Sequence, residues 1–284
     1  MYNVSSIKNK NLWKSLLKQE SLPNYFTEII DIDFGGFKAK MEAQDLNFQS
    51  NLIHKIFEGA IIQITNVLDD GLINSIINSS LTLSKKNISK KTLCVEGCQN
   101  YFYLQTEDLS RNGGYKTLDR SYYFFPWNLD QNNLFDKIND YWRYIKVLGG
   151  LNFDEYENNT PKDEVINRMH IIQYMKGGGT ISPHKDPIVY QKIQLGSVLN
   201  ELGKDFNSGG FSVFNKKKEK VFIEPKLKKG SLVCFMPSLY HTVDPVDPNN
   251  EIDLSKSDGR WYLSLTCVGS DHLKDRKKTT PINF

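Results

Sequence analysis

The sequence predicts a mainly β protein with flanking helices, in which short strands form a jelly roll of two facing sheets. The second half of the chain is a series of short apolar stretches separated by glycine-bearing turns, such as Gly177-Gly178-Gly179 and Gly209-Gly210. Many short strands joined by turns of this kind are typical of jelly rolls. The segments with helical spacing lie in the first half of the chain, so we expect helices to flank the sheets.

We expect residues 1–284 to form a single domain built in three parts. Residues 1–58 are poorly periodic, apart from a short helix expected over Leu12–Gln19, and are interpreted as an N-terminal wrap around the core. Residues 59–150 are interpreted as a support region of strand and helix. Residues 165–269 contain the glycine-separated strands and are predicted to form the β core.

Two helices are predicted in the support region. The apolar stretch Gly59–Leu68 is predicted to be a strand, after which Asp69 or Asp70 caps a helix that runs to Ile77 or beyond. Leu134–Leu148 is predicted to be a second helix that packs on the outer side of a sheet, because its apolar residues recur at intervals of three and four.

The β core is predicted strand by strand. Val165–Met175 alternates, so Arg168, His170, Ile172 and Tyr174 share one face of a strand. The strands expected after it are Pro187–Asn200, Phe211–Phe214, Val221–Ile223, Ser231–Phe235 and Arg260–Thr266. A polar insertion, Asp244–Asp258, precedes the last of them.

Composition limits the class of protein. A hydrophobic fraction of 39% and a charged fraction of 24% fall in the range of soluble globular proteins. We find no apolar run long enough for a membrane span and no export signal, so we expect a cytoplasmic protein without a membrane partner. A net charge of +3 is too small to indicate a polyanionic partner such as nucleic acid.

Four cysteines are interpreted as reduced thiols. Cys94 and Cys98 are close in sequence, but no second pair of cysteines or histidines lies nearby to complete a zinc site. Cys234 lies in an apolar run where a small buried thiol is expected.

The sequence His184-Lys185-Asp186 is a candidate metal site. On an extended backbone, residues i and i+2 point to the same side, so the imidazole and the carboxylate can bind one ion. His241, in the sequence Ser-Leu-Tyr-His-Thr-Val, is a candidate third ligand. Two histidines and one carboxylate form the facial triad of non-haem Fe(II) oxygenases. Alone, the tripeptide is weak evidence, because a histidine at a strand end is often only a polar residue.

The motifs around this site, taken in order, resemble a known family. The tripeptide is followed by Gly209–Phe214, then by Pro225–Val246 with His241, then by Gly259–Thr266. This pattern resembles the double-stranded β-helix, a cupin-like jelly roll, of the Fe(II)/2-oxoglutarate-dependent dioxygenases. The nearest likeness is to the prolyl-hydroxylase-like branch, which carries a tyrosine before a glycine-rich turn and H-x-D. The resemblance covers residues 165–269 and implies one catalytic domain.

The resemblance implies the cofactor and the cosubstrate. Fe(II) is expected on His184, Asp186 and His241, with 2-oxoglutarate and O2 filling the remaining positions. Arg260 is the expected partner of the far carboxylate of 2-oxoglutarate, since arginine offers a bidentate fork. Tyr174 and Ser264 are expected to add hydroxyl hydrogen bonds. Arg260 follows His241 by 19 residues, further than is usual in this family, and the insertion accounts for this if it bulges outward.

The implied reaction is hydroxylation of an unactivated C–H bond of a small molecule, with succinate and CO2 as co-products. We expect an amino acid, a sugar acid or a biosynthetic intermediate as substrate. Halogenases of the class carry Gly or Ala in place of Asp186, so hydroxylation is favoured, while desaturation and cyclisation stay open. Prolyl-type protein hydroxylation is the alternative. Nucleic-acid demethylation is less favoured, because Thr266 stands where that branch carries a second arginine, and a non-enzymatic cupin-like binding protein is the remaining alternative.

Candidate substrate contacts lie in the aromatic-rich stretch Tyr101–Trp127. Its rings are expected in the core, and part of the stretch is a candidate lining of the substrate pocket. Arg120 is the candidate for an acidic substrate group, and Trp127 is a second candidate contact. His170 is interpreted as a polar strand residue unrelated to the metal.

Overall fold

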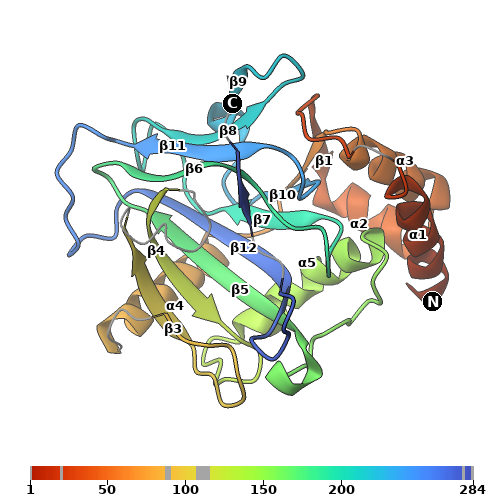
Figure 1. The fold of residues 1–284 in the computed structure, drawn as a ribbon, viewed down its shortest axis with the longest axis horizontal. Helices are drawn as coiled ribbons and strands as arrows, with labels where there is room; N and C mark the ends of the chain where they lie inside the picture. The colour runs from red at the N-terminus through yellow and green to blue at the C-terminus, as the bar shows by residue number, and fades with distance from the viewer. Residues whose placement is uncertain (1, 20–21, 87–90, 107–115, 277–278, 283–284) are drawn as a thin grey trace.

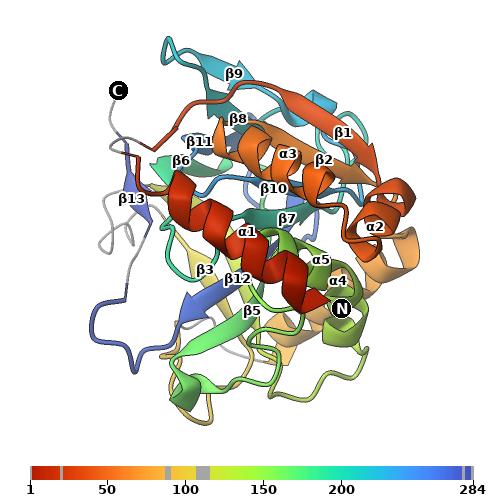
Figure 2. The same ribbon diagram turned by 90° about the vertical axis from the view of Figure 1, so that its right-hand side faces the viewer.

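Two β-sheets face each other, and helices cover the outer face of the larger one (Figures 1 and 2). The structure is a computed structural model that describes residues 2–19, 22–86, 91–106, 116–276 and 279–282. In Figure 1 the strands β11, β8 and β9 of the smaller sheet lie above β12, β5 and β4 of the larger one. The predicted mainly β fold with flanking helices is confirmed.

The larger sheet has the strand order β3-β4-β5-β12-β7-β10-β2-β1. Its strands are β3 (Tyr101–Gln105), β4 (Thr117–Phe124), β5 (Val165–Tyr174), β12 (Arg260–Gly269), β7 (Gln194–Val198), β10 (Leu232–Phe235), β2 (Ile61–Thr65) and β1 (Ile29–Asp33). The central pair is antiparallel over its whole length, from Arg260 opposite Tyr174 to Gly269 opposite Val165. This register places the predicted cosubstrate residues side by side.

The smaller sheet is formed by β6, β11, β8, β9 and β13, and β4 pairs with both β5 and β6 and so joins the two sheets. Its strands are β6 (Gly179–Lys185), β11 (His241–Val246), β8 (Gly210–Phe214), β9 (Lys220–Phe222) and β13 (Thr280–Pro281). The strand predicted over Pro187–Asn200 is shorter than expected, because only β7 is extended and paired there.

Alternation along the strands separates two apolar cores. On β10, Leu232 and Cys234 point to the helices, while Val233 and Phe235 point between the sheets. On β5, Met169 and Ile171 contact the helical side, whereas Tyr174 belongs to the inner core. Side chains of period two therefore bury both faces of the larger sheet. The inner face also lines the cavity described below.

The N-terminal segment is more regular than predicted. It forms α1 (Tyr2–Leu16), β1, α2 (Phe34–Glu42) and α3 (Leu46–Phe57), where only Leu12–Gln19 was expected to be helical. Apolar spacing did not predict helix α1, because its first turns face the protein with polar side chains. Asn9 is buried and donates to Gln49 Oε1 at 2.7 Å and to the carbonyl of Val147 at 2.9 Å. Satisfied hydrogen bonds replace apolar contacts there.

The two helices predicted in the support region are confirmed. Helix α4 spans Asp70–Lys86, and the Asp69 carboxylate caps it by accepting from the Leu72 amide at 2.7 Å. Helix α5 spans Leu134–Leu148, the predicted bounds, and buries Ile138 and Ile145. Figure 2 shows α1, α3 and α5 in front of the strands of the larger sheet. Within the described ranges, no helix combines the length and apolar character needed to cross a membrane.

Candidate metal centre and cavity

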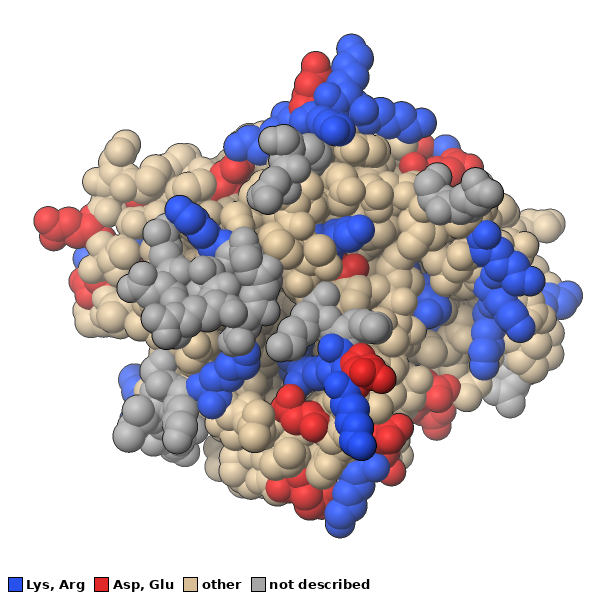
Figure 3. All heavy atoms as spheres, in the orientation of Figure 1, with Lys and Arg blue, Asp and Glu red and all other residues tan. Residues whose placement is uncertain are grey.

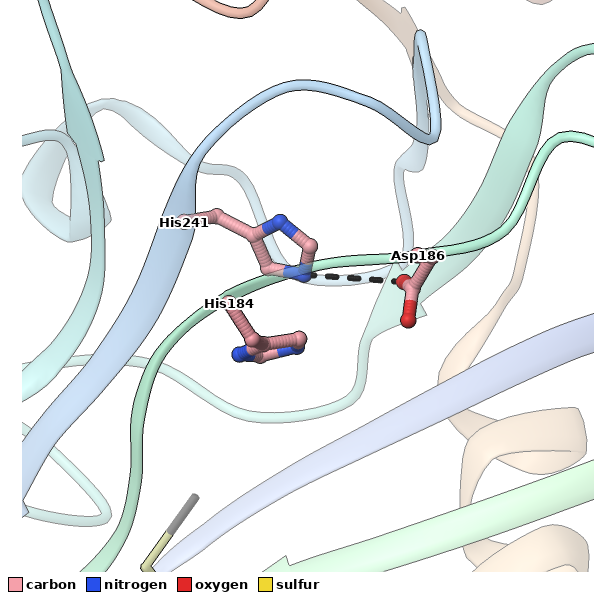
Figure 4. Close-up of side chains that lie close together, drawn as sticks. All are labelled: His184, Asp186 and His241. Atoms are coloured by element: carbon pink, nitrogen blue, oxygen red, sulfur yellow. Dashed lines mark ion pairs between the residues drawn. The ribbon is translucent and has the colours of Figure 1, made fainter. Parts of the chain in front are cut away.

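The structure brings His184, Asp186 and His241 together from two neighbouring strands. His184 lies near the end of β6 and pairs directly with His241, the first residue of β11, while Asp186 follows β6. The two imidazole rings have centroids 4.1 Å apart, and His241 Nε2 lies 3.7 Å from Asp186 Oδ2. One ligand atom from each residue lies within 4.8 Å of the others. Figure 4 shows the three side chains converging on one point.

Backbone carbonyls orient both imidazoles. Nδ1 of His184 lies 2.8 Å from the carbonyl oxygen of Ser182, and Nδ1 of His241 lies 2.8 Å from that of Leu239. A carbonyl oxygen only accepts, so each Nδ1 carries the proton and each Nε2 keeps its lone pair for a metal. Asp186 Oδ1 accepts a hydrogen bond from Thr279 Oγ1 at 2.9 Å, which orients the carboxylate.

The protonation state suits metal binding. Burial, followed by the neighbouring His241, lowers the pKa of His184 to about 4, so this imidazole is neutral near pH 7. A neutral imidazole and an ionised carboxylate are the forms that coordinate a cation. Two histidine nitrogens and one carboxylate with open positions form a donor set that fits Fe(II).

The triad opens into a cavity of about 640 Å³ between the two sheets. This volume is in the range of small-molecule sites. Tyr174, Arg260 and Ser264, the three residues predicted to contact the cosubstrate, all line it. Ser264 Oγ accepts from Gln194 Nε2 at 3.3 Å. The cavity therefore contains both the candidate metal ligands and the candidate cosubstrate residues.

A buried carboxylate holds the guanidinium of Arg260. Nε donates to both oxygens of Glu224, at 2.9 Å each, and only 1% of each side chain is exposed. The guanidinium carbon lies 5.8 Å from the ring centre of Tyr174 and 5.3 Å from that of Tyr262. Both hydrogen bonds to Glu224 use Nε, so among the described residues the two Nη nitrogens of the fork are left for a ligand. Glu224 was not predicted, since nothing in its local sequence links it to Arg260.

The insertion before Arg260 bulges outward, which accounts for the long spacing from His241. Strand β11 ends at Val246 and β12 begins at Arg260, and no described residue from 247 to 259 lines the cavity. Gln173, on the outer face of β5, donates to the carbonyl of Asp258 at 2.7 Å. The insertion is thus bound to the outside of the larger sheet.

Arg120 and Trp127 lie away from the cavity lining. The Arg120 guanidinium donates to the carbonyls of Leu254 and Lys256 in the insertion. Trp127 Nε1 donates to the carbonyl of Cys98 at 2.8 Å. Neither residue lines the cavity. A contact with substrate is untested for both residues and stays a prediction. Other members of the aromatic stretch, namely Tyr101, Tyr103, Tyr123 and Phe125, do line it, and Tyr115 lies outside the described residues.

Polar residues that sequence reasoning did not select as a site also line the cavity. Asp119 accepts from Thr117, Ser121 and Gln105, and burial raises its pKa to about 6. His170, on the same strand face as Tyr174, lies 2.8 Å through Nε2 from Ser121 Oγ. The alternation of residues along β5 places His170 on the same face as Tyr174, and this is the sequence pattern that could have predicted its position in the cavity. Its burial, and then the nearby Arg168, lower the pKa of His170 well below the usual range, so it is neutral.

The four cysteines are free and buried, as predicted for reduced thiols. Cys94 and Cys98 pack with Phe125 and Ile166 in a small cluster, of which Cys94, Phe125 and Ile166 also line the cavity. Among the described residues, the metal-binding geometry is found at His184, Asp186 and His241 and not at the cysteines.

Solved structures share this fold. A prolyl hydroxylase from Trichoplax adhaerens, in complex with a peptide fragment of the hypoxia inducible factor oxygen degradation domain, is 13% identical with a TM-score of 0.50, covering 81% of this chain and 91% of its own. A putative 2OG-Fe(II) oxygenase family protein from Caulobacter crescentus is 14% identical with a TM-score of 0.50, covering 84% of this chain and 85% of its own. A Pseudomonas putida prolyl-4-hydroxylase is 14% identical with a TM-score of 0.48, covering 78% of this chain and 98% of its own.

The two structures with a TM-score of 0.50 confirm the predicted jelly-roll fold. No protein-family model and no curated protein matches the sequence. At identities of 13% and 14%, these structures show the fold alone, and the chemistry of this protein depends on its own site residues.

Proposed function

We propose that this protein is an Fe(II)- and 2-oxoglutarate-dependent oxygenase that hydroxylates an unactivated C–H bond of a small molecule. The observation that carries the proposal is one cavity lined by a triad of two histidines and one carboxylate and by a buried arginine held by Glu224. His184, Asp186 and His241 are the residues that would hold Fe(II). When bound, the iron and the cosubstrate supply the oxidising power with O2, and succinate and CO2 are the co-products.

Arg260 is the proposed anchor of the far carboxylate of 2-oxoglutarate. A carboxylate buried in this cavity needs a charged partner, and the free Nη nitrogens of Arg260 offer a bidentate fork. Tyr174 lies opposite Arg260 across β5 and β12, and burial raises the pKa of its hydroxyl well above the usual range. The hydroxyl therefore keeps its proton and can donate a hydrogen bond to a carboxylate oxygen. Ser264 supplies a second hydroxyl on the same face.

Hydroxylation is favoured over halogenation because Asp186 is present and turned toward the two histidines. A small-molecule substrate is favoured by the shape of the site, a cavity between sheets lined by aromatic rings. The alternative is a protein side chain, as in prolyl hydroxylation. Nucleic acid is less favoured, since Lys and Arg are interspersed with Asp and Glu on the face shown in Figure 3.

Succinate formation tests the proposal without knowledge of the substrate. The protein would be purified anaerobically and given Fe(II) and 2-oxoglutarate, oxygen would be admitted and succinate followed, since enzymes of this class often decarboxylate the cosubstrate slowly on their own. We expect succinate from the wild type, with a loss of at least about 100-fold in His241→Ala, which lacks an iron ligand, and in Arg260→Ala, which lacks the anchor.

His54→Ala is the matched control, because His54 is exposed on α3 and remote from the triad. It should form succinate at the wild-type rate. Iron binding without succinate in the wild type would contradict the proposal and favour a cupin-like binding protein. Activity that survives Arg260→Ala would keep the class of enzyme and move the anchor to another residue.

A further inference from the structure

Arg168 lines the cavity, and within the described ranges of the chain it has no acidic partner. It shares the cavity face of β5 with His170, Ile172 and Tyr174. Its Nε donates to Thr266 Oγ1 on β12 at 3.3 Å, and its guanidinium carbon lies 5.0 Å from the ring centre of Tyr123. These two contacts fix the direction of the side chain, and no other described residue takes up its Nη nitrogens.

Each of the other two arginines in the described lining has a carboxylate partner within the protein. Arg260 is paired with Glu224, and Arg276 Nη1 lies 2.7 Å from Asp271 Oδ1. Among the described residues, no carboxylate forms an ion pair with Arg168. A partly buried guanidinium without a counter-charge is costly in an empty cavity and favourable when an anion binds.

The cosubstrate cannot be that anion. Arg260 lies opposite Tyr174 and Arg168 lies opposite Thr266, six residues apart along β5 and β12. At a rise of about 3.3 Å per residue, the two arginines are roughly 20 Å apart along the sheet. A short dicarboxylate held by Arg260 and the triad does not reach Arg168. The anion belongs to a second ligand of the same cavity.

The surroundings of Arg168 define the kind of anion. Tyr123 stacks on His170 with centroids 4.3 Å apart and on Tyr101 with centroids 4.7 Å apart, so aromatic faces lie next to the guanidinium. A single guanidinium matches a carboxylate with one negative charge through two parallel hydrogen bonds, whereas a dianionic phosphate usually meets several cations. Of the acidic side chains in the described lining, Asp271 is paired with Arg276 and Asp186 belongs to the triad. The third, Asp119, lies toward Tyr174 and the cosubstrate end.

We propose that Arg168 binds the carboxylate of the substrate, which is a free small organic acid whose carbon skeleton lies along Tyr123 and His170 toward the triad. That this acid is the substrate rests on the proposed function, but the binding of its carboxylate to Arg168 is measured independently of turnover.

The test compares acids with their neutral counterparts. A panel of L-amino acids and simple monocarboxylic acids, each with its primary amide, would be titrated against the protein loaded with Mn(II) and 2-oxoglutarate, and binding would be followed by thermal unfolding. We expect at least one acid to bind about tenfold or more tightly than its amide, because the amide lacks the charge-assisted bidentate contact with Arg168. Arg168→Gln should weaken the acid by a similar factor, and Arg168→Lys should restore part of it.

Arg276→Gln is the matched control, since it removes a cavity arginine that is already paired, and it should keep the preference for acid over amide. Equal binding of acid and amide in every pair would overturn the proposal, as would unchanged acid binding in Arg168→Gln. Tighter binding of inorganic phosphate than of any acid would overturn the carboxylate assignment. Succinate formation by the wild type is recorded in parallel, so a failure of the proposed function is seen separately from a failure of the Arg168 assignment.

Discussion

At the scale of single residues, the contact between Glu224 and Arg260 couples stability to the cosubstrate site. Glu224 also accepts from the Phe211 amide at 2.6 Å, so the backbone of β8 as well as Arg260 fixes the position of the carboxylate. Removing one partner of a buried pair leaves an uncompensated charge and costs about 3–5 kcal/mol. We therefore expect Glu224→Gln and Arg260→Met each to lower the free energy of unfolding by about 3 kcal/mol, and the double variant to lose less than the sum.

A double-mutant cycle in urea measures this coupling. The exposed pair Lys204 and Glu201, 2.7 Å apart with 72% and 43% of the side chains exposed, is the matched control and should show a coupling energy below about 1 kcal/mol. Losses that simply add for Glu224 and Arg260 would show that the two charges act independently.

Asp119 makes stability depend on pH in a direction opposite to that of most acids. Its pKa is raised to about 6 in the folded protein, against about 3.9 in an unfolded chain. Between these values the folded state holds the extra proton, so stability falls as pH rises from about 4 to about 6, by up to about 3 kcal/mol. Asp119→Asn removes this titration and should gain stability relative to the wild type across that window. Urea unfolding at several pH values tests it, and a constant difference would refute the expectation.

At the scale of elements, the sequence was informative wherever one physical signal governed the local structure. Apolar spacing predicted α5 to the residue, and the Asp69 cap predicted the start of α4. The i, i+2 geometry of His184 and Asp186, together with a distant His241, predicted the triad that β6 and β11 bring together.

The elements that were missed depend on partners distant in the chain. Helix α1 turns a polar face, with Asn9, toward Gln49 and Val147, and its sequence alone shows no apolar stripe. Strands β3 and β4 were seen only as aromatic residues, because pairing with β5 is what makes them part of the sheet. Glu224 could not be predicted as a partner of Arg260, because the two residues are distant in sequence and meet where η3 (Glu224–Lys226) lies against β12. Each case is a long-range contact, which no local pattern encodes.

At the scale of the whole molecule, a metal ion at the triad would stabilise the fold, because it would join β6 and β11 through His184, Asp186 and His241. A ligand that binds only the folded state adds about 2.7 kcal/mol at a concentration 100 times its Kd. For a chain of this length we expect saturating Mn(II) to raise Tm by roughly 5 °C or more, and EDTA to reverse the rise. His184→Ala should abolish the shift and His54→Ala should keep it. An equal shift in His184→Ala would place the bound metal elsewhere.

Thr279→Val should weaken the binding of the metal by about 10-fold or more, since it frees the Asp186 carboxylate from its orienting hydrogen bond.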